Sequence, residues 1–225
     1  MDRYQYKPLS PRGKQIRLVV VHPRVPSYPE EIRVTIFETP LEAERRLWPS
    51  FMALSYVWGD ADNRRDLTVV DLKDEMGPDH LTSPKRLSVT ANLMEALIYL
   101  PWPDKHSILW IDAICINQVD MDEKAVQIPL MSQIYSKSKS VVVWFGPSIP
   151  QTLAFMADFD RVKLIGREWV ALSSQNRDPY VEGQALPSED DPFWGGLFHL
   201  LNSEWFRRLW YVLCFVSYSS LQATR

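Results

Sequence analysis

The sequence predicts an α/β fold, with a mostly parallel sheet flanked by helices. Residues 51–57, 108–116 and 141–145 are short apolar runs, which is the pattern of strands that are buried on both faces of a sheet. Between the last two runs, residues 124–135 change to helical spacing, with apolar side chains recurring every four positions. Strands that alternate with helices in this way favour a parallel sheet covered on both faces. We therefore expect the three runs to be neighbouring strands of one sheet.

Residues 1–50 are predicted to be a lead-in to this fold that could hold a β-hairpin. Residues 16–21 are an apolar strand candidate, and residues 32–37 alternate apolar and polar side chains, as a half-exposed strand does. Residues 22–30, between them, carry three prolines, which favours an extended loop. We expect such a hairpin to lie at the edge of the main sheet.

Residues 51–216 are predicted to form the main domain, which holds further elements on either side of the central helix. A short strand is expected at residues 67–72, followed by a helix within residues 87–100 that has Thr90 as its N-cap. Pro129 should kink the central helix or place its start nearer Gln127. After Gly146 the pattern loosens into three helical stretches and a tail without pattern, at residues 152–165, 193–201, 204–216 and 217–225.

Composition and charge exclude several classes of protein. The chain has 225 residues and a net charge of −3, with no block of Lys and Arg, so we expect no nucleic-acid surface. No apolar run is long enough to span a bilayer and no signal peptide opens the chain, so we expect a cytoplasmic protein. The two cysteines, Cys115 and Cys214, have no metal-binding spacing and are interpreted as buried reduced thiols. We therefore expect no metal site.

Two polar clusters follow strands of the predicted sheet and are the first candidates for a site. Trp58, Gly59 and Asp60 follow one strand, while Asn117 and Gln118 follow the next. Ligands of parallel sheets bind at the carboxyl ends of the strands. We therefore expect these residues, apart from the glycine, to line one cleft together with Asp112, the acid that interrupts the central strand.

Each candidate side chain has a structural interpretation beside the functional one. Asp112 could bind a ligand or cap a backbone amide, and Asn117 with Gln118 could bind a nucleotide or tie their own loop. Glu123 could be a general acid or base, or it could complete a capping box with Asp120. Gln127 lies one helical turn after Glu123, on the same face of the helix. No Walker A or G-x-G-x-x-G motif is present.

The aromatic residues leave the same choice open. Large aromatic side chains at strand ends could stack on a ligand, but they are more often part of the core. Arg208 could bind phosphate or stack on an indole ring. The tryptophans concerned are Trp58, Trp110, Trp144, Trp205 and Trp210.

Three blocks of sequence together have a specific pattern. ALSYVWG at residues 53–59 is followed by SVTANLMEAL at residues 88–97, the second block fills residues 109–146, and WFRRLW at residues 205–210 is the third. This pattern resembles the HET domain, the heterokaryon-incompatibility domain of filamentous fungi, over roughly residues 51–212. The resemblance implies functional or motif roles for Ser55, Tyr56, Trp58, Gly59, Asp60, Asp112, Asn117, Gln118, Glu123, Gln127, Tyr135, Trp205, Arg208 and Trp210.

The resemblance also implies a function. HET domains act in fungal non-self recognition and regulated cell death, and they are remotely similar to Toll/interleukin-receptor (TIR) domains. TIR domains are flavodoxin-like folds that self-associate, and some of them cleave NAD. The expected fold is thus flavodoxin- or TIR-like, and the expected function is a signalling module that acts through a protein partner or self-association.

One departure from the family pattern bears on catalysis. The family usually has Gln and Glu at the positions that hold Leu213 and Cys214 here, and the catalytic residue of NAD-cleaving relatives is a glutamate on this helix. NAD is therefore a candidate substrate only if another acid, Glu123 or Glu204, compensates, and no catalytic residue is assigned. Because the chain ends soon after the third block, we expect the fold to be incomplete at its C-terminus. A truncated, inactive product is a third hypothesis.

Overall fold

The computed structural model describes most of the chain, in two compact units. The first unit includes Met1–Gly146 and the second is Pro147–Arg207. The described residues are 1–10, 14–28, 30–42, 49–71, 84–100, 106–150, 152–153, 155–156, 159, 188 and 190–207.

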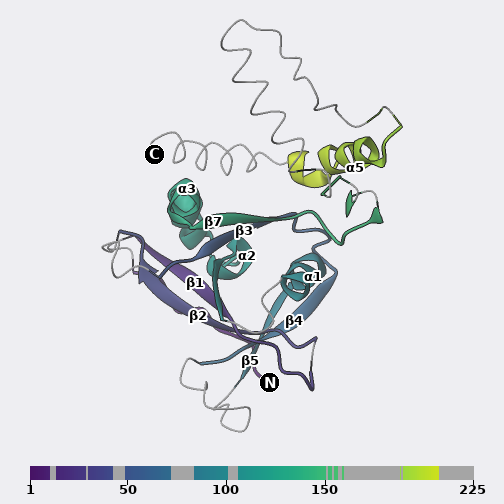
Figure 1. Cartoon of the computed structure of the whole chain (residues 1–225). Helices are drawn as coiled ribbons and strands as arrows, with labels where there is room; N and C mark the ends of the chain where they lie inside the picture. The colour runs from purple at the N-terminus through teal and green to yellow at the C-terminus, as the bar shows by residue number, and fades with distance from the viewer. Residues whose placement is uncertain are drawn as a thin grey trace, which may run out of the picture. The chain divides into compact units, whose positions relative to one another are not determined.

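A seven-stranded sheet forms the first unit, in the order β5-β4-β2-β1-β6-β3-β7 (Figure 1). The predicted α/β fold is confirmed, and the three predicted strands are neighbours as β6, β3 and β7, which are parallel. The sheet as a whole is mixed, so the prediction of a mostly parallel sheet was wrong. β2–β4 is the other parallel pair, whereas β1–β2, β1–β6 and β4–β5 are antiparallel. The strands are β1 (Gln15–Val21), β2 (Arg33–Pro40), β3 (Met52–Tyr56), β4 (Arg64–Val69), β5 (Lys85–Thr90), β6 (Ser107–Trp110) and β7 (Ser140–Trp144).

The predicted hairpin of the lead-in exists, but it lies inside the sheet. β1 and β2 pair antiparallel along their lengths, from Gln15 opposite Pro40 to Val21 opposite Val34. β1 also pairs with β6, and β2 pairs with β4, so neither strand is at an edge. The physical reason is that β1 is buried from Ile16 to Val20, so the backbone N–H and C=O groups along both of its edges need hydrogen-bond partners. The division into lead-in, domain and tail stays a prediction.

The predicted strand at residues 108–116 is shorter than expected. β6 ends at Trp110, and Asp112–Cys115 forms the short helix α2, whose Cys115 N–H bonds to the Ile111 carbonyl at 2.7 Å. Ile114 and Cys115 are fully buried. A continuous apolar run fits a buried helix as well as a buried strand, so periodicity could not separate the two.

Helices α1 (Ala91–Tyr99) and α3 (Met121–Lys137) cover the sheet. Thr90 caps α1 as predicted, by accepting a hydrogen bond from the Leu93 N–H at 3.4 Å. The residues before Thr90 belong to strand β5 rather than to the helix. α3 begins at Met121 and continues through Pro129, so this proline does not mark its start.

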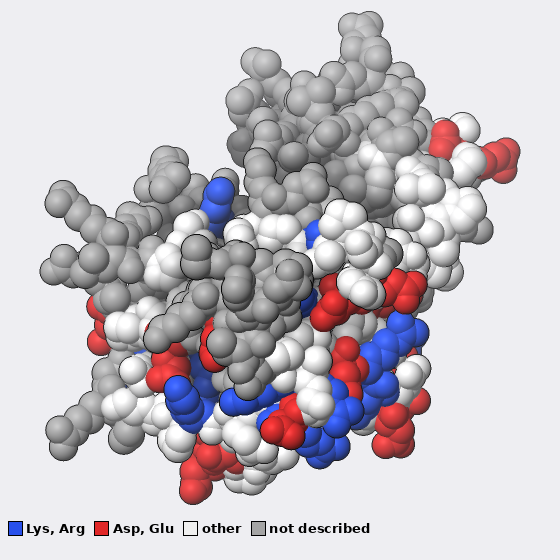
Figure 2. Space-filling view, turned by 90° about the horizontal axis from the view of Figure 1, so that it is seen from below, with Lys and Arg blue, Asp and Glu red and all other residues white. Residues whose placement is uncertain are grey.

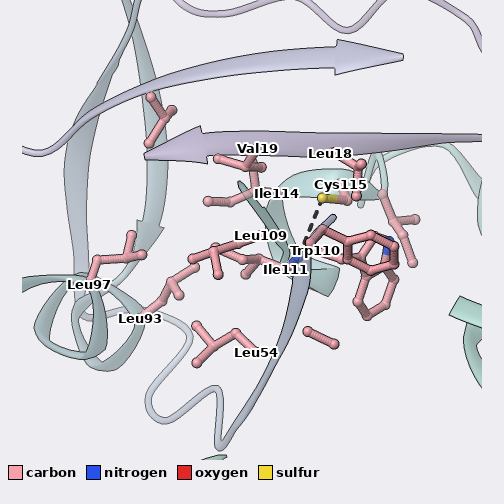
Figure 3. Packing of buried hydrophobic residues seen from close by; sticks show 14 of the residues in the cluster. Leu18, Val19, Leu54, Leu93, Leu97, Leu109, Trp110, Ile111, Ile114 and Cys115 are labelled. Carbon is pink, nitrogen blue, oxygen red and sulfur yellow. Dashed lines mark hydrogen bonds between the residues drawn. The ribbon is translucent and has the colours of Figure 1, made fainter. Parts of the chain in front are cut away.

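Side chains of successive β6 residues reach opposite faces of the sheet, as strand geometry requires. Trp110 packs against Tyr135 of α3, with ring centroids 5.5 Å apart. In Figure 3, Leu93 and Leu97 of α1 lie with Leu109 on the other side. The core of this unit therefore includes buried side chains on both faces of the sheet. The face shown in Figure 2 carries Lys, Arg, Asp and Glu side chains interspersed.

The second unit contains helix α5 (Pro192–Leu201), as predicted, and the 3₁₀ turn η3 (Glu204–Arg207). Asp191 caps α5 by accepting from the Phe193 N–H at 2.8 Å, and Phe193 packs on Phe155 with centroids 5.1 Å apart. Within the described residues, no helix combines the length and hydropathy needed to cross a membrane. The helix expected at 204–216 is a 3₁₀ turn where it is described. Its remainder, the tail and most of 152–165 lie outside the described residues.

Candidate functional site

The carboxyl ends of β3 and β6 bring two motif residues into direct contact. The strands are parallel, so the residues that follow them emerge at one edge of the sheet. The Trp58 indole Nε1–H donates to Asp112 Oδ2 at 2.9 Å, and Asp112 Oδ1 accepts from the Ala113 N–H at 2.8 Å. The Gln118 side-chain amide donates to the Asp112 backbone carbonyl at 2.9 Å. Three of the five residues predicted to line a cleft are thus linked by hydrogen bonds.

Asn92 joins this site, although the sequence reasoning did not select it. Its side-chain amide donates to the Val57 carbonyl, and its Oδ1 accepts from the Trp144 indole N–H at 3.3 Å. Asn92 therefore connects the ends of β3 and β7 to the first turn of α1. The available signal was a polar amide two residues after the predicted N-cap, in a helix that is otherwise apolar at this end.

Gly59 explains why the backbone can turn at this point. Its φ is +73°, a conformation that L side chains rarely adopt, and a Cβ at this position would lie 3.2 Å from Asn92 Cβ. Glycine thus permits both the turn and the close approach of α1.

The other two residues of the predicted cleft have local bonds. Asp60 is exposed and accepts from the Asp62 N–H at 2.9 Å, which closes a turn. Asn117 Oδ1 accepts from the Val119 N–H at 3.4 Å, so it ties its own loop. A shared cleft of all five residues stays a prediction.

Glu123 forms a buried ion pair with Arg17, a residue that the sequence reasoning also missed. Arg17 Nη1 is 2.6 Å from Glu123 Oε1, and Nη2 is 2.9 Å from Oε2. The two side chains are 1% and 7% exposed. Burial lowers the pKa of Arg17, but the hydrogen bonds and charge of Glu123 outweigh it, so the pKa is raised overall. The available signal was an arginine inside the apolar run IRLVVV, which needs a partner when buried.

Further hydrogen bonds from the two Nη atoms of Arg17 bind the chain on either side of the pair. Its guanidinium donates to the Cys115 carbonyl at 3.0 Å and to the Lys7 carbonyl at 2.7 Å, and it lies 4.9 Å from the ring centroid of Tyr6. The Tyr6 hydroxyl donates to the Ile114 carbonyl at 2.8 Å. Arg17 therefore holds the N-terminal segment, α2 and α3 together.

The predicted capping box at the start of α3 is half correct. The Asp120 carboxylate accepts from the Glu123 N–H at 2.9 Å, as predicted. Glu123, however, does not bond back to the Asp120 N–H, which donates to the Asn117 carbonyl at 3.2 Å. Its Oε1 instead accepts from the Asn117 N–H at 2.7 Å, in addition to the bonds from Arg17. The Glu123 carboxylate is thus fully engaged within the fold.

Gln127 and Glu123 share a face of α3, as predicted, and this face lies on β1. The Gln127 amide donates to the Gln15 carbonyl at 2.8 Å, one helical turn from the contact between Glu123 and Arg17. Two residues along a strand span about 6.6 Å and four along a helix about 6 Å, so the two spacings match. The helix is thereby fixed in register on β1.

Most of the remaining motif residues are part of the core. Ser55 and Tyr56 are buried in β3, Trp110 is buried in β6 and Trp205 is buried in η3. Trp144 is half-buried and stacks on Tyr99 with ring centroids 5.5 Å apart. The Tyr135 hydroxyl donates to the Leu54 carbonyl at 3.5 Å. Glu204 is exposed in η3. Arg208, Trp210, Leu213 and Cys214 lie outside the described residues.

Cys115 is a buried and unreactive thiol in the described structure. It has no exposed surface, and burial raises its pKa to about 12. No group of three or more His, Cys, Asp or Glu side chains suited to a metal ion occurs in the described part of the chain.

Comparison with known proteins identifies the family. The family model described as "Heterokaryon incompatibility protein (HET)" matches residues 51–213. "Heterokaryon incompatibility protein 6, OR allele" from Neurospora crassa is 29% identical over 240 residues, which cover 92% of this chain and 32% of the relative. The chain thus spans about a third of that relative's length. No solved structure matches the chain. Because the family model matches well over half of its residues, the chain belongs to the heterokaryon incompatibility (HET) family.

Proposed function

We propose that this chain is a HET signalling module that acts in fungal non-self recognition and triggers regulated cell death in the cytoplasm. The signal passes through a protein partner or through self-association of the module. The observation that carries this proposal is the family match over residues 51–213, together with a heterokaryon incompatibility protein as a relative. The chain corresponds to only a third of that relative. The protein partner and the recognised signal are therefore part of what we propose for this chain.

The geometry of the motif acids supports a signalling module over an enzyme. Asp112 accepts hydrogen bonds from Trp58 and from the Ala113 N–H of α2, and Glu123 is held by Arg17. A general acid or base must exchange a proton with substrate, so a carboxylate held by a buried guanidinium is poorly suited to that role. These acids instead hold the loops at the carboxyl ends of the strands.

Forced proximity in a filamentous fungus tests the proposal. The chain is fused to a chemically inducible dimerisation module and expressed, and the loss of viability is followed by dye uptake after the inducer is added. We expect cell death that increases when the inducer is added, and none from the dimerisation module alone. Normal viability despite confirmed expression and dimerisation would overturn the proposal.

An assay with NAD separates this function from that of a TIR-like hydrolase. We expect the purified chain to release no nicotinamide from NAD, because Leu213 and Cys214 supply no carboxylate to stabilise the charge that develops as nicotinamide leaves. Such an electrostatic contribution is worth on the order of a hundredfold or more in rate. Turnover that survives Glu123→Ala and Glu204→Ala would contradict this reasoning. Turnover gained only in a Leu213→Gln/Cys214→Glu variant would locate the lost catalytic position.

A further inference from the structure

The outer edge of β7 is open within the described residues. β7 is the last strand of the sheet and pairs with β3 from Ser140 to Trp144. Its sequence, SVVVW, is uncharged and rich in β-branched residues, and every residue of the strand is half-buried. Edge strands of soluble proteins usually carry charges, prolines or bulges that prevent pairing with another chain. β7 has none of these features.

The opposite edge of the sheet is paired at one residue, Arg86 of β5. The Arg86 N–H of β5 donates to the Asp2 carbonyl at 2.7 Å, and the Tyr4 N–H donates to the Arg86 carbonyl at 2.8 Å. The Arg86 side chain also bonds to the Met1 carbonyl at 3.0 Å. The N-terminus accordingly lies beside β5 in Figure 1. Because β5 also begins with two charged residues, Lys85 and Arg86, β7 is the border better suited to pairing with another strand.

Exposed aromatic side chains flank the open edge. Tyr99 stacks on Trp144 with ring planes inclined by 26°, and 59% of its surface is exposed. Phe145, directly after β7, is 42% exposed. Large aromatic side chains are enriched at protein interfaces because they bury much apolar area.

We propose that β7 pairs antiparallel with β7 of a second copy of this chain, so that two sheets join across a twofold axis. The strand is self-complementary: with Val142 at the axis, Val141 lies opposite Val143 of the second copy, and no charge opposes another. Pairs of β-branched residues are favourable across antiparallel strands. A twofold contact uses the same strand of both copies, so the assembly closes as a dimer. This inference rests on the proposed function, for which it names the surface of self-association.

A lysine in β7 tests the dimer. Val143 is the residue of choice, because Val141, Val142 and Trp144 pack against the core cluster. The matched control is Val119→Lys, since Val119 is 89% exposed in the loop before α3. We expect the unmodified chain and the control to dimerise in sedimentation equilibrium, and Val143→Lys to weaken the dimer by about tenfold or more, because the substitution acts twice across the axis. Circular dichroism confirms that the variant is folded. A folded Val143→Lys variant that dimerises as tightly as the control overturns the proposal.

Hydrogen exchange keeps the test decisive if Val143→Lys does not fold. We expect protection of the β7 amides in the unmodified chain to rise with protein concentration. A monomer with the same β7 protection at every concentration would mean that another segment of the chain covers the edge, and the proposal would be wrong. The two proposals fail separately. A β7 dimer without any effect on viability overturns the proposed function, whereas cell death caused by a chain that stays monomeric overturns the dimer.

Discussion

Replacing Glu123 by glutamine leaves the buried Arg17 guanidinium without a counter-charge. The variant keeps one oxygen that can accept from Arg17 or from the Asn117 N–H, but it loses the negative charge and one of the two short contacts of 2.6 and 2.9 Å. Removing one partner of a buried ion pair costs about 3–5 kcal/mol in unfolding free energy. Because glutamine retains an acceptor, we expect a loss near the lower end, about 3 kcal/mol.

Removing both charges should cost less than the two single changes together. In an Arg17→Met/Glu123→Leu variant no charge is left unpaired, and apolar replacement of a buried pair is often nearly neutral. The carbonyls of Lys7 and Cys115 still lose their donor, so part of the loss remains. We expect a coupling energy of about 2 kcal/mol between the two positions in a double-mutant cycle.

Urea unfolding followed by tryptophan fluorescence measures these changes, with Glu204→Gln in the exposed turn η3 as the matched control. We expect the control to change the unfolding free energy by less than about 0.5 kcal/mol. A loss below about 1 kcal/mol for Glu123→Gln would refute the structural role of the pair. A catalytic role would instead show as lost activity without lost stability.

Further predictions concern two glycines, Gly59 and Gly195, and the buried thiol of Cys115. Gly59→Ala should destabilise the chain by about 1–2 kcal/mol, because of the φ of +73° and the close approach to Asn92. Gly195→Ala in α5, where a Cβ meets nothing within 4 Å, should stabilise the chain by up to about 1 kcal/mol. Calorimetry measures both changes in stability, and equal effects would contradict the argument. In a Cys214→Ser background, Cys115 should react with a disulfide reagent only on unfolding, since a pKa of about 12 leaves roughly one thiolate in ten thousand at pH 8. Because the pKa of Cys115 in the folded chain lies above the unfolded value of 9.0, this thiol also lowers the free energy of unfolding as pH rises from about 9 to 12. Fast labelling of Cys115 in the folded chain at pH 8 would refute both expectations.

The sequence predicts an element well when the residues that determine it are neighbours in the chain. α3 was predictable because its apolar spacing and the Asp120 cap lie within one segment. The sheet position of β1 was not, because a hairpin can form at an edge or inside a sheet, and only the pairing with β6 and β4 decides between them. α2 was mistaken for part of a strand because buried helices and buried strands share a continuous apolar pattern.

The candidate site shows the same limit. The pairing of Trp58 with Asp112 follows from two parallel strands that end at one edge, so topology was enough to expect them near each other. The partner of Glu123 lies more than a hundred residues earlier, in a strand whose place in the sheet was not known. Non-local polar pairs of this kind need the register between elements, which a single sequence does not contain.

The central position of β1 has a consequence for how the chain is made. Val19 of β1 pairs with Leu109 of β6, which is translated 90 residues later. At about 5–20 residues per second, the ribosome takes roughly 5–18 s to produce this neighbour. The strands β1, β2, β4 and β5 can assemble during that time, but the flank of β1 and its arginine stay uncovered. A nascent chain that has grown to about residue 100 is therefore an open half-sheet with uncovered strand edges, which a chaperone would protect.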